Sequence, residues 1–481
     1  MTTALNAPAT QAPEPALIER FTRIVGEQHA LTDPDAQLPY LREWRDQYIG
    51  KTPVVLRPGS APEVAAILKL AHDTRTPVVP QSGNTGLVGG QIPHESGHEV
   101  VLSTQRLNKV RAVDPSRTSM VCEAGVTLEE AHAAARAHGR MFALSLPSKG
   151  SCRIGGNLAT NAGGVNVLAY GNARQQVLGL EVALADGRLW DGLRALKKDN
   201  TGYDLKDLFI GSEGTLGIIT AAVLKLLPQP AERATAVVAL ASPAQALDLF
   251  MRAQDQAGAD LTAFELMARL CIELAVAHVP GCRDPLAVPY PWYTLIEISS
   301  LREDGRAQAT LESVLGAALD DGVILDAAIA QSERQAMELW RPREGVSEAQ
   351  KPAGGNIKHD VSVPIAQIPA FITAADAAVK RVCPDARPIA LGHFGDGNVH
   401  YNVIQPPGME RAAFLARWDE IAYEVHGVVT RMGGSISAEH GIGRLKRRQL
   451  AQVKAPVELE MMRAIKRTFD PNGILNPGKL L

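Results

Sequence analysis

The sequence has little of what marks secreted, membrane and nucleic-acid-binding proteins. It contains only five cysteines in 481 residues, and none of them stands in a C-x-x-C pair. An odd number of cysteines without that spacing argues against a disulfide framework and indicates a reducing compartment. No apolar run approaches the roughly 20 residues that span a bilayer. We therefore expect a cytoplasmic protein with no transmembrane segment.

Neither positive nor negative charge predominates in the sequence. The formal net charge is −3 and long runs of like charge are absent, which is not typical of a dedicated nucleic-acid binder. The first residues lack the basic start and apolar core of a signal peptide, so we expect a disordered tail over residues 1–15. With 46% hydrophobic residues, the rest of the chain has the composition of a globular protein.

Two familiar motifs are missing or out of context. No G-x-G-x-x-G run follows a strand, so an ordinary Rossmann dinucleotide site is not supported. Residues 94–98 spell H-E-x-x-H, a zinc-protease string that needs both histidines on one face of a helix. Pro93 before the string, Gly97 inside it and a β-prone run directly after it do not fit a helix. We therefore expect no zinc-protease site there.

The sequence pattern differs before and after Pro228. Over residues 17–139, short apolar runs alternate with helix signals, such as the capping boxes that start at Ser60 and Thr127. After Pro228 the pattern predicts strands at 235–240, 292–298 and 323–329, with helices at 244–257 and 307–319. This second half is typical of an antiparallel sheet with helices on one face.

Glycine is plentiful, with 42 residues, and two loops hold many of them. Residues 80–90 follow a predicted strand and combine four glycines with polar side chains, and residues 155–164 have the same character. Glycines let backbone N–H groups approach an anion closely. Either loop alone could be a tight turn, but two such loops without a P-loop lysine favour a site for a large dinucleotide.

A metal site is predicted from a hairpin signal at Asp396-Gly397, which lies between β-prone runs. With these two residues as the loop, His393 stands opposite His400, and opposite residues share a face with Cβ atoms about 5 Å apart. Two imidazoles so placed could hold one ion. The alternative is a histidine pair stacked in a polar surface sheet. Asn402 lies on the same face as His400.

Residues 435–443 form an extended run that breaks into a basic helix. Glu439 would complete a set of two histidines and one carboxylate with an open position, as in catalytic zinc sites, and His440 would be an adjacent base. The alternative is that Glu439 and His440 only cap the following helix. Such a ligand set suits zinc, manganese and cobalt.

Several strings are similar to those of a known family. PVVPQSGNTGLVGG, GGNLATNAGG, DLKDLFIGSEGTLGIIT and FDPNGILNPGKLL resemble flavoenzymes of the vanillyl-alcohol oxidase type, at the expected spacings over most of the chain. The resemblance implies an α+β fold with a two-lobed PCMH-type FAD-binding domain and an antiparallel-sheet substrate (cap) domain. It places the FAD-binding domain at residues 16–228, the substrate domain with the metal site at 229–466, and a C-terminal segment returning to the FAD domain at 467–481.

The same resemblance implies which residues bind FAD. They lie in the glycine-rich loops, in the run around residue 214 and in the C-terminal segment: Pro80, Ser82, Gly83, Asn84, Thr85, Gly86, Ser148, Gly155, Asn157, Thr160, Asn161, Gly163, Glu213, Gly214, Ile219 and Asn476. Relatives with covalent FAD use a histidine or cysteine in these loops. The first loop has neither, and Cys152 alone precedes the second, so we expect non-covalent FAD.

HFGDGNVHYN and SISAEHGIG resemble the D-2-hydroxy-acid dehydrogenase branch, most closely its members that act on D-2-hydroxyglutarate. The resemblance makes three residues metal ligands: His393, His400 and Glu439. It makes His440 the catalytic base. Five residues would contact the substrate: Arg343, Ser347, Lys358, Asn402 and His440. Ser347 stands where the branch usually has threonine, and the lost methyl could loosen specificity.

The implied reaction is the FAD- and metal-dependent oxidation of D-2-hydroxyglutarate to 2-oxoglutarate, with hydride transfer to flavin N5. Zinc is the first choice of metal, and manganese or cobalt is a further one. An electron-transfer flavoprotein or a quinone pool would accept the electrons, and a homodimer is the commonest default. Three alternatives stay open: the same chemistry on D-lactate, D-malate or glycolate; a flavin-free metal hydrolase; and a flavin-binding scaffold without catalysis.

Overall fold

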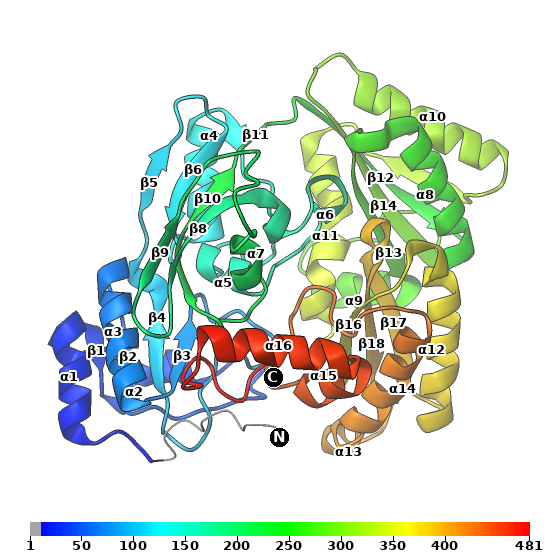
Figure 1. Cartoon of the computed structure of the whole chain (residues 1–481). Helices are drawn as coiled ribbons and strands as arrows, with labels where there is room; N and C mark the ends of the chain where they lie inside the picture. Colours follow the sequence, from blue (N-terminus) through cyan, green and yellow to red (C-terminus); the bar gives the residue numbers. More distant parts are fainter. Residues whose placement is uncertain (1–10) are drawn as a thin grey trace. The chain divides into compact units, whose positions relative to one another are not determined.

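The computed structural model describes residues 11–481, so most of the expected N-terminal tail lies outside the described residues. Helix α1 (Pro15–Val25) begins at the last residue of that expected tail. The described chain divides into two compact units, whose elements are labelled in Figure 1. The first unit holds the chain up to Gly163, Gly171–Pro228 and Glu439–Leu481, and the second holds Gly164–Tyr170 and Gln229–Ala438.

The first unit contains a four-stranded sheet of order β1-β2-β4-β3. Its strands are β1 (Ala30–Leu31), β2 (Val55–Leu56), β3 (Val78–Gln81) and β4 (Val100–Ser103). β2 and β3 run parallel to β4, whereas β1 is antiparallel to β2. Parallel strands are buried on both faces, which explains the apolar runs Val78-Val79 in β3 and Val100-Val101-Leu102 in β4. Side chains of α1 and of α3 (Ala61–Thr74) complete this core.

A second, five-stranded sheet of the same unit is antiparallel and has the order β5-β6-β10-β8-β9. Its strands are β5 (Val110–Val113), β6 (Ser119–Glu123), β8 (Val177–Ala183), β9 (Leu189–Gly192) and β10 (Ile218–Lys225). Side chains of α4 (Leu128–Ala137) and α5 (Ile154–Ala159) share a separate core with it. The first unit therefore has two lobes, each with its own sheet and core.

The first unit also contains several shorter or later elements. They are α2 (Pro34–Leu41), β7 (Arg140–Met141), α7 (Lys206–Phe209), β11 (Leu227–Pro228), α15 (Arg447–Val453) and α16 (Pro456–Phe469). The expected helix starts are confirmed: Ser60 caps α3, and Thr127 with Glu130 forms a complete capping box on α4. All five cysteines are buried and carry no disulfide. Among residues 11–481, no helix is both long and apolar enough to cross a membrane.

The second unit is built on one seven-stranded antiparallel sheet of order β15-β12-β14-β13-β17-β18-β16. The strands are β12 (Glu232–Leu240), β13 (Leu261–Ala268), β14 (Trp292–Ser300), β15 (Asp326–Ile329), β16 (Asn356–Ser362), β17 (Arg387–His393) and β18 (Asn398–Ile404). The predicted strands at 235–240 and 292–298 are confirmed as β12 and β14. The third predicted strand, at 323–329, begins later, at Asp326.

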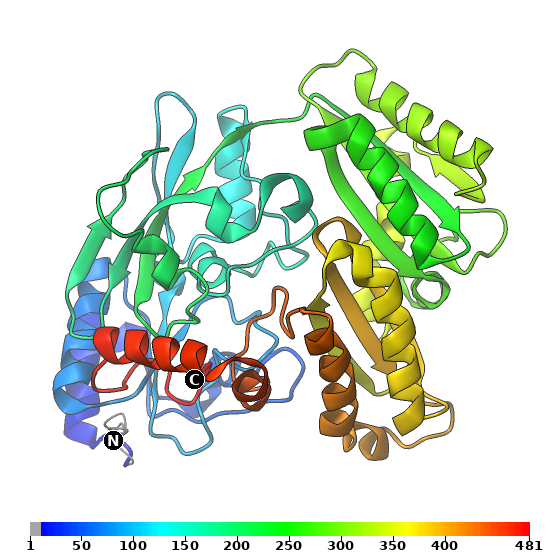
Figure 2. The same ribbon diagram turned by 45° about the vertical axis from the view of Figure 1, so that its right-hand side comes forward.

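Helices cover both faces of this sheet rather than one. One layer consists of α8 (Pro243–Ala257), α10 (Arg306–Asp320), α12 (Ile368–Val382) and α14 (Trp418–Arg431), which pack in a row along the sheet (Figures 1 and 2). On the other face, α9 (Arg269–His278) and α11 (Glu333–Ala349) share a core with Val237, Met267 and Leu295. The α+β class is confirmed, but α9 and α11 correct the one-face prediction. Two short helices, α6 (Val167–Tyr170) and α13 (Arg411–Leu415), complete the unit.

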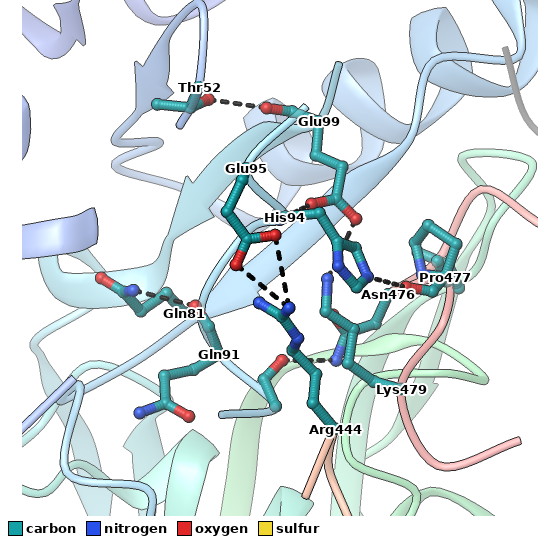
Figure 3. A network of polar contacts seen from close by, with 12 residues as sticks. Thr52, Gln81, Gln91, His94, Glu95, Glu99, Arg444, Asn476, Pro477 and Lys479 are labelled. Atoms are coloured by element: carbon teal, nitrogen blue, oxygen red, sulfur yellow. Dashed lines mark hydrogen bonds and ion pairs between the residues drawn. The ribbon is translucent and has the colours of Figure 1, made fainter. Parts of the chain in front are cut away.

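The C-terminal segment rejoins the first unit at Glu439, earlier than the predicted residue 467. Figure 3 shows part of what holds it there. The Nζ atom of Lys479 lies 2.9 Å from Glu99 Oε1, and both side chains are buried. Glu99 also accepts a hydrogen bond from the backbone N–H of His94, and Arg444 pairs with Glu95. The string at 94–98 is not helical, as the sequence pattern predicted, and His94 and Glu95 contact the C-terminal segment.

Candidate functional site

The glycine-rich loops that sequence analysis singled out meet in the first unit. Ser82 Oγ accepts a hydrogen bond from the Gly156 N–H over 3.2 Å, so the first loop contacts the second. A Cβ atom on Gly83 would lie 2.2 Å from the Ser151 carbonyl oxygen, and one on Gly214 would lie 2.4 Å from a carbon of Pro80. Because real Cβ atoms do not approach so closely, glycine is required at both positions for the loops to pack.

Asn476 joins this group from the C-terminal segment. Its Nδ2 donates to the carbonyl oxygens of Gly90 and Glu213 over 3.0 and 2.9 Å. Its Oδ1 is buried and has no hydrogen-bond partner among residues 11–481. A buried acceptor of this kind suits a donor group on a bound molecule, because an unpaired buried acceptor is costly. The loops therefore fit a large polar cofactor on this observation.

Two asparagines that were expected to line the cofactor stabilise the conformation of the loops. Asn84 has φ +53° and donates from Nδ2 to the carbonyl oxygens of Pro39 and Arg42. Asn161 has φ +51°, and its Oδ1 accepts from the Arg174 N–H. Asparagine tolerates this left-handed region better than most residues. These two asparagines thus have a conformational role in the loops.

Glu213, which was expected to line the cofactor, also binds the backbone of the C-terminal segment. Its two carboxylate oxygens accept hydrogen bonds from the backbone N–H groups of Ile442 and Gly443, both over 2.7 Å. Burial raises the pKa of Glu213 above its ordinary value, although the two N–H donors counteract that effect. The turn that directly follows Glu439 and His440 is therefore fixed by the carboxylate of Glu213, which belongs to the first unit.

The hairpin predicted at Asp396-Gly397 has a different register. His400 stands opposite Leu391 rather than His393. Strand pairing stops at Leu391 because Gly392 has φ +150° and a 3₁₀ turn covers residues 394–396. A shift of two residues leaves every side chain on its original face. The prediction of the pairing was wrong, but the two histidine rings still lie together, with centroids 5.5 Å apart.

One face of the second unit's sheet gathers most of the polar residues that were expected in the site. His400 stands opposite Asp360, and Asn402 stands opposite Lys358, across β18 and β16. Residues that are directly paired share a face, as do residues two apart on one strand. His393 joins them from β17. This is the face that α9 and α11 cover, because Ile389 and Leu391 of β17 belong to the core of those helices.

Four side chains could hold a metal ion, and we call them the carboxylate–histidine cluster: Asp360, His400, Glu439 and His440. One ligand atom from each lies within 4.8 Å of all the others. Asp360 is buried and accepts from Asn398 Nδ2 over 2.9 Å. The helix-cap alternative for Glu439 and His440 is wrong, because α15 begins only at Arg447 and Lys446 is its N-cap.

His393 lies beside this cluster and has a carboxylate partner of its own. Its Nδ1 is 2.7 Å from Glu265 Oε1, and Glu265 Oε2 accepts from Arg343 Nε over 2.6 Å. Burial alone would raise the pKa of Glu265, but the charges of Arg343 and His393 outweigh it and hold the pKa at about 2. His393 is 7% exposed, so the alternative of a stacked pair in a polar surface sheet does not fit.

The remaining residues of the expected substrate site lie around α11 and β16. Arg343 is buried on α11, and Ser347 is exposed one helical turn later, on the same side of the helix. Asn402 is buried and donates from Nδ2 to Gln350 Oε1 over 3.0 Å. Lys358 is half-buried on β16. Arg343, Lys358 and Asn402 all belong to the second unit.

Three residues of this arrangement were not predicted from the sequence: Asp360, Glu265 and Gln350. Asp360 stands opposite His400 on a strand 40 positions earlier, and Glu265 stands opposite His393 from 128 positions away. No local spacing links these pairs. The only available signal was the presence of an acidic residue within a β-prone run, which is rare in a buried strand.

Solved structures of other proteins share the fold of this chain. The chain superposes on p-cresol methylhydroxylase with a TM-score of 0.75 at 17% identity, over 97% of this chain and 96% of that one. It superposes on alkyldihydroxyacetonephosphate synthase with a TM-score of 0.73 at 17% identity, over 99% and 86%. At such identities the likeness concerns the fold alone, and that fold is the PCMH-type α+β fold expected from the sequence.

Two protein-family models match the chain. Residues 229–480 match the family model described as FAD linked oxidases, C-terminal domain, and residues 52–192 match the one described as FAD binding domain. The chain therefore belongs to the FAD-linked oxidase family, and it is an FAD-dependent oxidoreductase.

Curated relatives cover nearly the whole chain. A D-2-hydroxyglutarate dehydrogenase of Xanthomonas citri pv. viticola is 38% identical over 93% of both chains. The mitochondrial D-2-hydroxyglutarate dehydrogenase of Bos taurus is 39% identical over 94% of this chain and 81% of its own. A probable mitochondrial D-2-hydroxyglutarate dehydrogenase of Oryza sativa subsp. indica is 39% identical over 96% and 81%.

Proposed function

We propose that this enzyme oxidises D-2-hydroxyglutarate to 2-oxoglutarate with the help of FAD and a divalent metal. The observation that carries the proposal is the carboxylate–histidine cluster, next to a sheet face that also presents Lys358 and Asn402 and is covered by Arg343 of α11. The names of the curated relatives support the choice of substrate.

His440 is the proposed base. Its ring nitrogen Nε2 lies 3.9 Å from Glu439 Oε1, so a negative charge is near when the imidazole takes up a proton. In the reaction, the hydroxyl O–H bond breaks and its proton goes to His440, while the hydrogen on the α-carbon leaves with both electrons of its bond. The carbon–oxygen bond then becomes a carbonyl. A well-placed base contributes about 10²–10⁴-fold to such a rate.

Arg343 and Lys358 would bind the carboxylate at the far end of the substrate. Arg343 uses Nε for Glu265, so its two Nη groups are the ones that a substrate carboxylate would meet, in the bidentate manner typical of arginine. D-lactate and glycolate have no second carboxylate that could bind to these two cations. This favours a dicarboxylic hydroxy acid, either D-2-hydroxyglutarate or the shorter D-malate.

The cofactors are assigned to residues by their chemistry. Non-covalent FAD would be held by the glycine-rich loops and Asn476, and it supplies the acceptor for the hydride. A metal would be held by His393, His400 and Glu439, with Asp360 close by, and it would make the substrate hydroxyl more acidic. Imidazole and carboxylate donors suit zinc first, then manganese or cobalt.

We further propose that the dehydrogenase is a cytoplasmic homodimer, the commonest oligomer, and that it passes its electrons to an electron-transfer flavoprotein or a quinone. Rapid reoxidation of the reduced enzyme by such an acceptor, and slow reoxidation by oxygen, is the expected outcome of stopped-flow mixing. Fast reaction with oxygen alone would contradict the acceptor part of the proposal.

An anaerobic visible spectrum tests the function directly. The purified protein should show a flavin band that bleaches on addition of D-2-hydroxyglutarate and does not bleach with the L enantiomer. Bleaching by D-malate alone would change the substrate, and a flavin that no hydroxy acid bleaches would leave a non-catalytic scaffold. A colourless protein after incubation with FAD would contradict the cofactor assignment and favour a flavin-free hydrolase.

Metal removal tests the second cofactor. After dialysis against EDTA, bleaching by D-2-hydroxyglutarate should be lost while the flavin band remains, and zinc or manganese should restore it. The flavin band is the internal control, because it shows that the protein has kept its FAD. Full activity in a preparation shown by elemental analysis to be metal-free would overturn the metal assignment.

A further inference from the structure

We infer that Glu265 is a positioning residue that ties the metal ligand His393 to the substrate-binding Arg343, so that metal affinity and substrate affinity depend on one buried carboxylate. The inference rests on the proposed function and deepens it. It concerns a residue of β13 that no motif of the sequence singles out.

The carboxylate of Glu265 contacts His393 with one oxygen and Arg343 with the other. Its side chain is 1% exposed, one oxygen lies 2.7 Å from His393 Nδ1, and the other accepts from Arg343 Nε over 2.6 Å. Glu265 and His393 are direct partners across β13 and β17, whereas Arg343 approaches from α11. Two strands and one helix therefore converge on a single carboxyl group.

This contact decides which nitrogen of His393 can bind a metal. A carboxylate oxygen beside Nδ1 requires the proton on Nδ1, so in the neutral imidazole, which is the form that binds metals, the lone pair is on Nε2. Metal-binding histidines commonly donate their other N–H to a carboxylate in this way, and loss of that partner typically lowers metal affinity about 10–100-fold. Glu265 thus sets both the orientation and the tautomer of His393.

The same carboxylate orients the guanidinium of Arg343. Because Nε is hydrogen-bonded to Glu265, the plane of the guanidinium is fixed and its two Nη groups point away from that contact. A carboxylate is needed for the double task, since it offers an acceptor oxygen to each donor. A glutamine has one acceptor oxygen and one NH2 group, so it would turn a donor toward either His393 or Arg343.

The test uses the FAD-bound protein and two variants of Glu265. Glu265→Gln keeps the size of the side chain but removes one acceptor, and Glu265→Asp keeps both acceptors on a shorter side chain. Glu297→Gln is the matched control: Glu297 lies two positions from Leu295 on β14 and accepts from Trp340 of α11 and from Thr235, without contact to His393 or Arg343.

Two quantities are measured for each protein: the Kd for Mn²⁺, by competition with a chelator, and the KM and kcat for D-2-hydroxyglutarate. In Glu265→Gln we expect the Kd to rise about 10–100-fold and the KM to rise at least tenfold. Glu265→Asp should show smaller increases in both. Glu297→Gln should match the wild type in both, because a change in α11 packing alone would not alter the tautomer of His393.

The outcomes separate this inference from the proposed function. A folded, FAD-bound Glu265→Gln protein with wild-type Kd and KM overturns the inference and leaves the proposed function intact. If Glu265→Gln does not fold, Glu265→Asp decides, and unchanged values there also overturn it. A wild-type protein that binds no Mn²⁺ and does not bleach with any hydroxy acid overturns the proposed function and this inference together.

Discussion

Glu213 in the first unit and Glu265 in the second are both buried carboxylates that accept two hydrogen bonds, yet they differ in the donors. The donors to Glu213 are two backbone N–H groups, of Ile442 and Gly443, whereas those to Glu265 are the side chains of Arg343 and His393. The pKa of Glu213 is raised by burial, and that of Glu265 is lowered to about 2 in spite of burial. Charged side-chain donors account for the opposite directions.

The two kinds of donor correspond to different roles of the two carboxylates. Backbone donors fix the path of the chain, and Glu213 uses them to hold the turn after His440. Side-chain donors can themselves bind ligands, and Glu265 contacts His393 and Arg343, the proposed metal ligand and the proposed substrate clamp. Replacements in the first unit's polar contacts should therefore affect stability first, and replacements around the metal site should affect chemistry first. The following predictions test this contrast.

The largest effect is expected on turnover, when the proposed catalytic base His440 is replaced. His440→Ala should lower kcat about 10²–10⁴-fold, because the hydroxyl proton would lose its base. The flavin spectrum and the thermal unfolding midpoint should match those of the wild type, since His440 lies in an irregular segment and is 23% exposed. Steady-state kinetics and a thermal scan measure both. Wild-type turnover in this variant would remove His440 from the role of base.

The next effect is expected in the C-terminal anchor of the first unit. Lys479→Met would leave Glu99 buried without its cation, and breaking a buried pair in this way costs about 3–5 kcal/mol of unfolding free energy. Urea unfolding followed by flavin fluorescence and circular dichroism measures the loss. Lys454→Met is the control, because its ion pair with Glu458 is exposed and worth about 0–1 kcal/mol. Equal losses in the two variants would show that burial does not matter here.

Glu213→Gln should have a moderate effect. Glutamine offers one acceptor oxygen, so one of the two backbone N–H groups would lose its partner, at about 1–3 kcal/mol of unfolding free energy. The Kd for Mn²⁺ should change much less than in Glu265→Gln. A variant as stable as the wild type but with Mn²⁺ binding abolished would reverse the contrast between the two glutamates.

The smallest effect is expected at Ser347. Ser347→Thr adds a methyl group one turn after Arg343 on α11, at a position where the sequence resemblance leads us to expect threonine. One added methyl is worth about 0.8 kcal/mol when buried, or roughly a fourfold change in kcat/KM. The ratio of kcat/KM for D-2-hydroxyglutarate over D-malate should rise by no more than that. A larger change would mean that this helix position controls specificity directly.

Much of the architecture could be predicted from local patterns. The capping boxes at Ser60 and Thr127 mark the two helices they begin, and the glycine-rich loops do meet. His393 and His400 lie together because an alternating strand keeps its faces even when the register shifts by two. Local sequence rules fix faces more firmly than they fix registers.

What could not be predicted depends on pairing between distant strands. Asp360 and Glu265 stand opposite the two histidines because β16 and β13 happen to be their neighbours in the sheet. The order of strands in an antiparallel sheet of seven is a property of the whole unit, and no local spacing encodes it. The covering of the second sheet face by α9 and α11 was missed for the same reason.

The division of the chain between the two units has a consequence for synthesis. The second unit is complete once Ala438 has been made, whereas the first unit needs Glu439–Leu481. Glu99 and Lys479 are separated by 380 residues, so a ribosome adding about 5–20 residues per second takes about 20–80 s from one to the other. During that time Glu99 has no access to its buried partner. The unit that appears first in the sequence is therefore the last to finish folding, and its nascent chain must remain protected until residue 479 emerges.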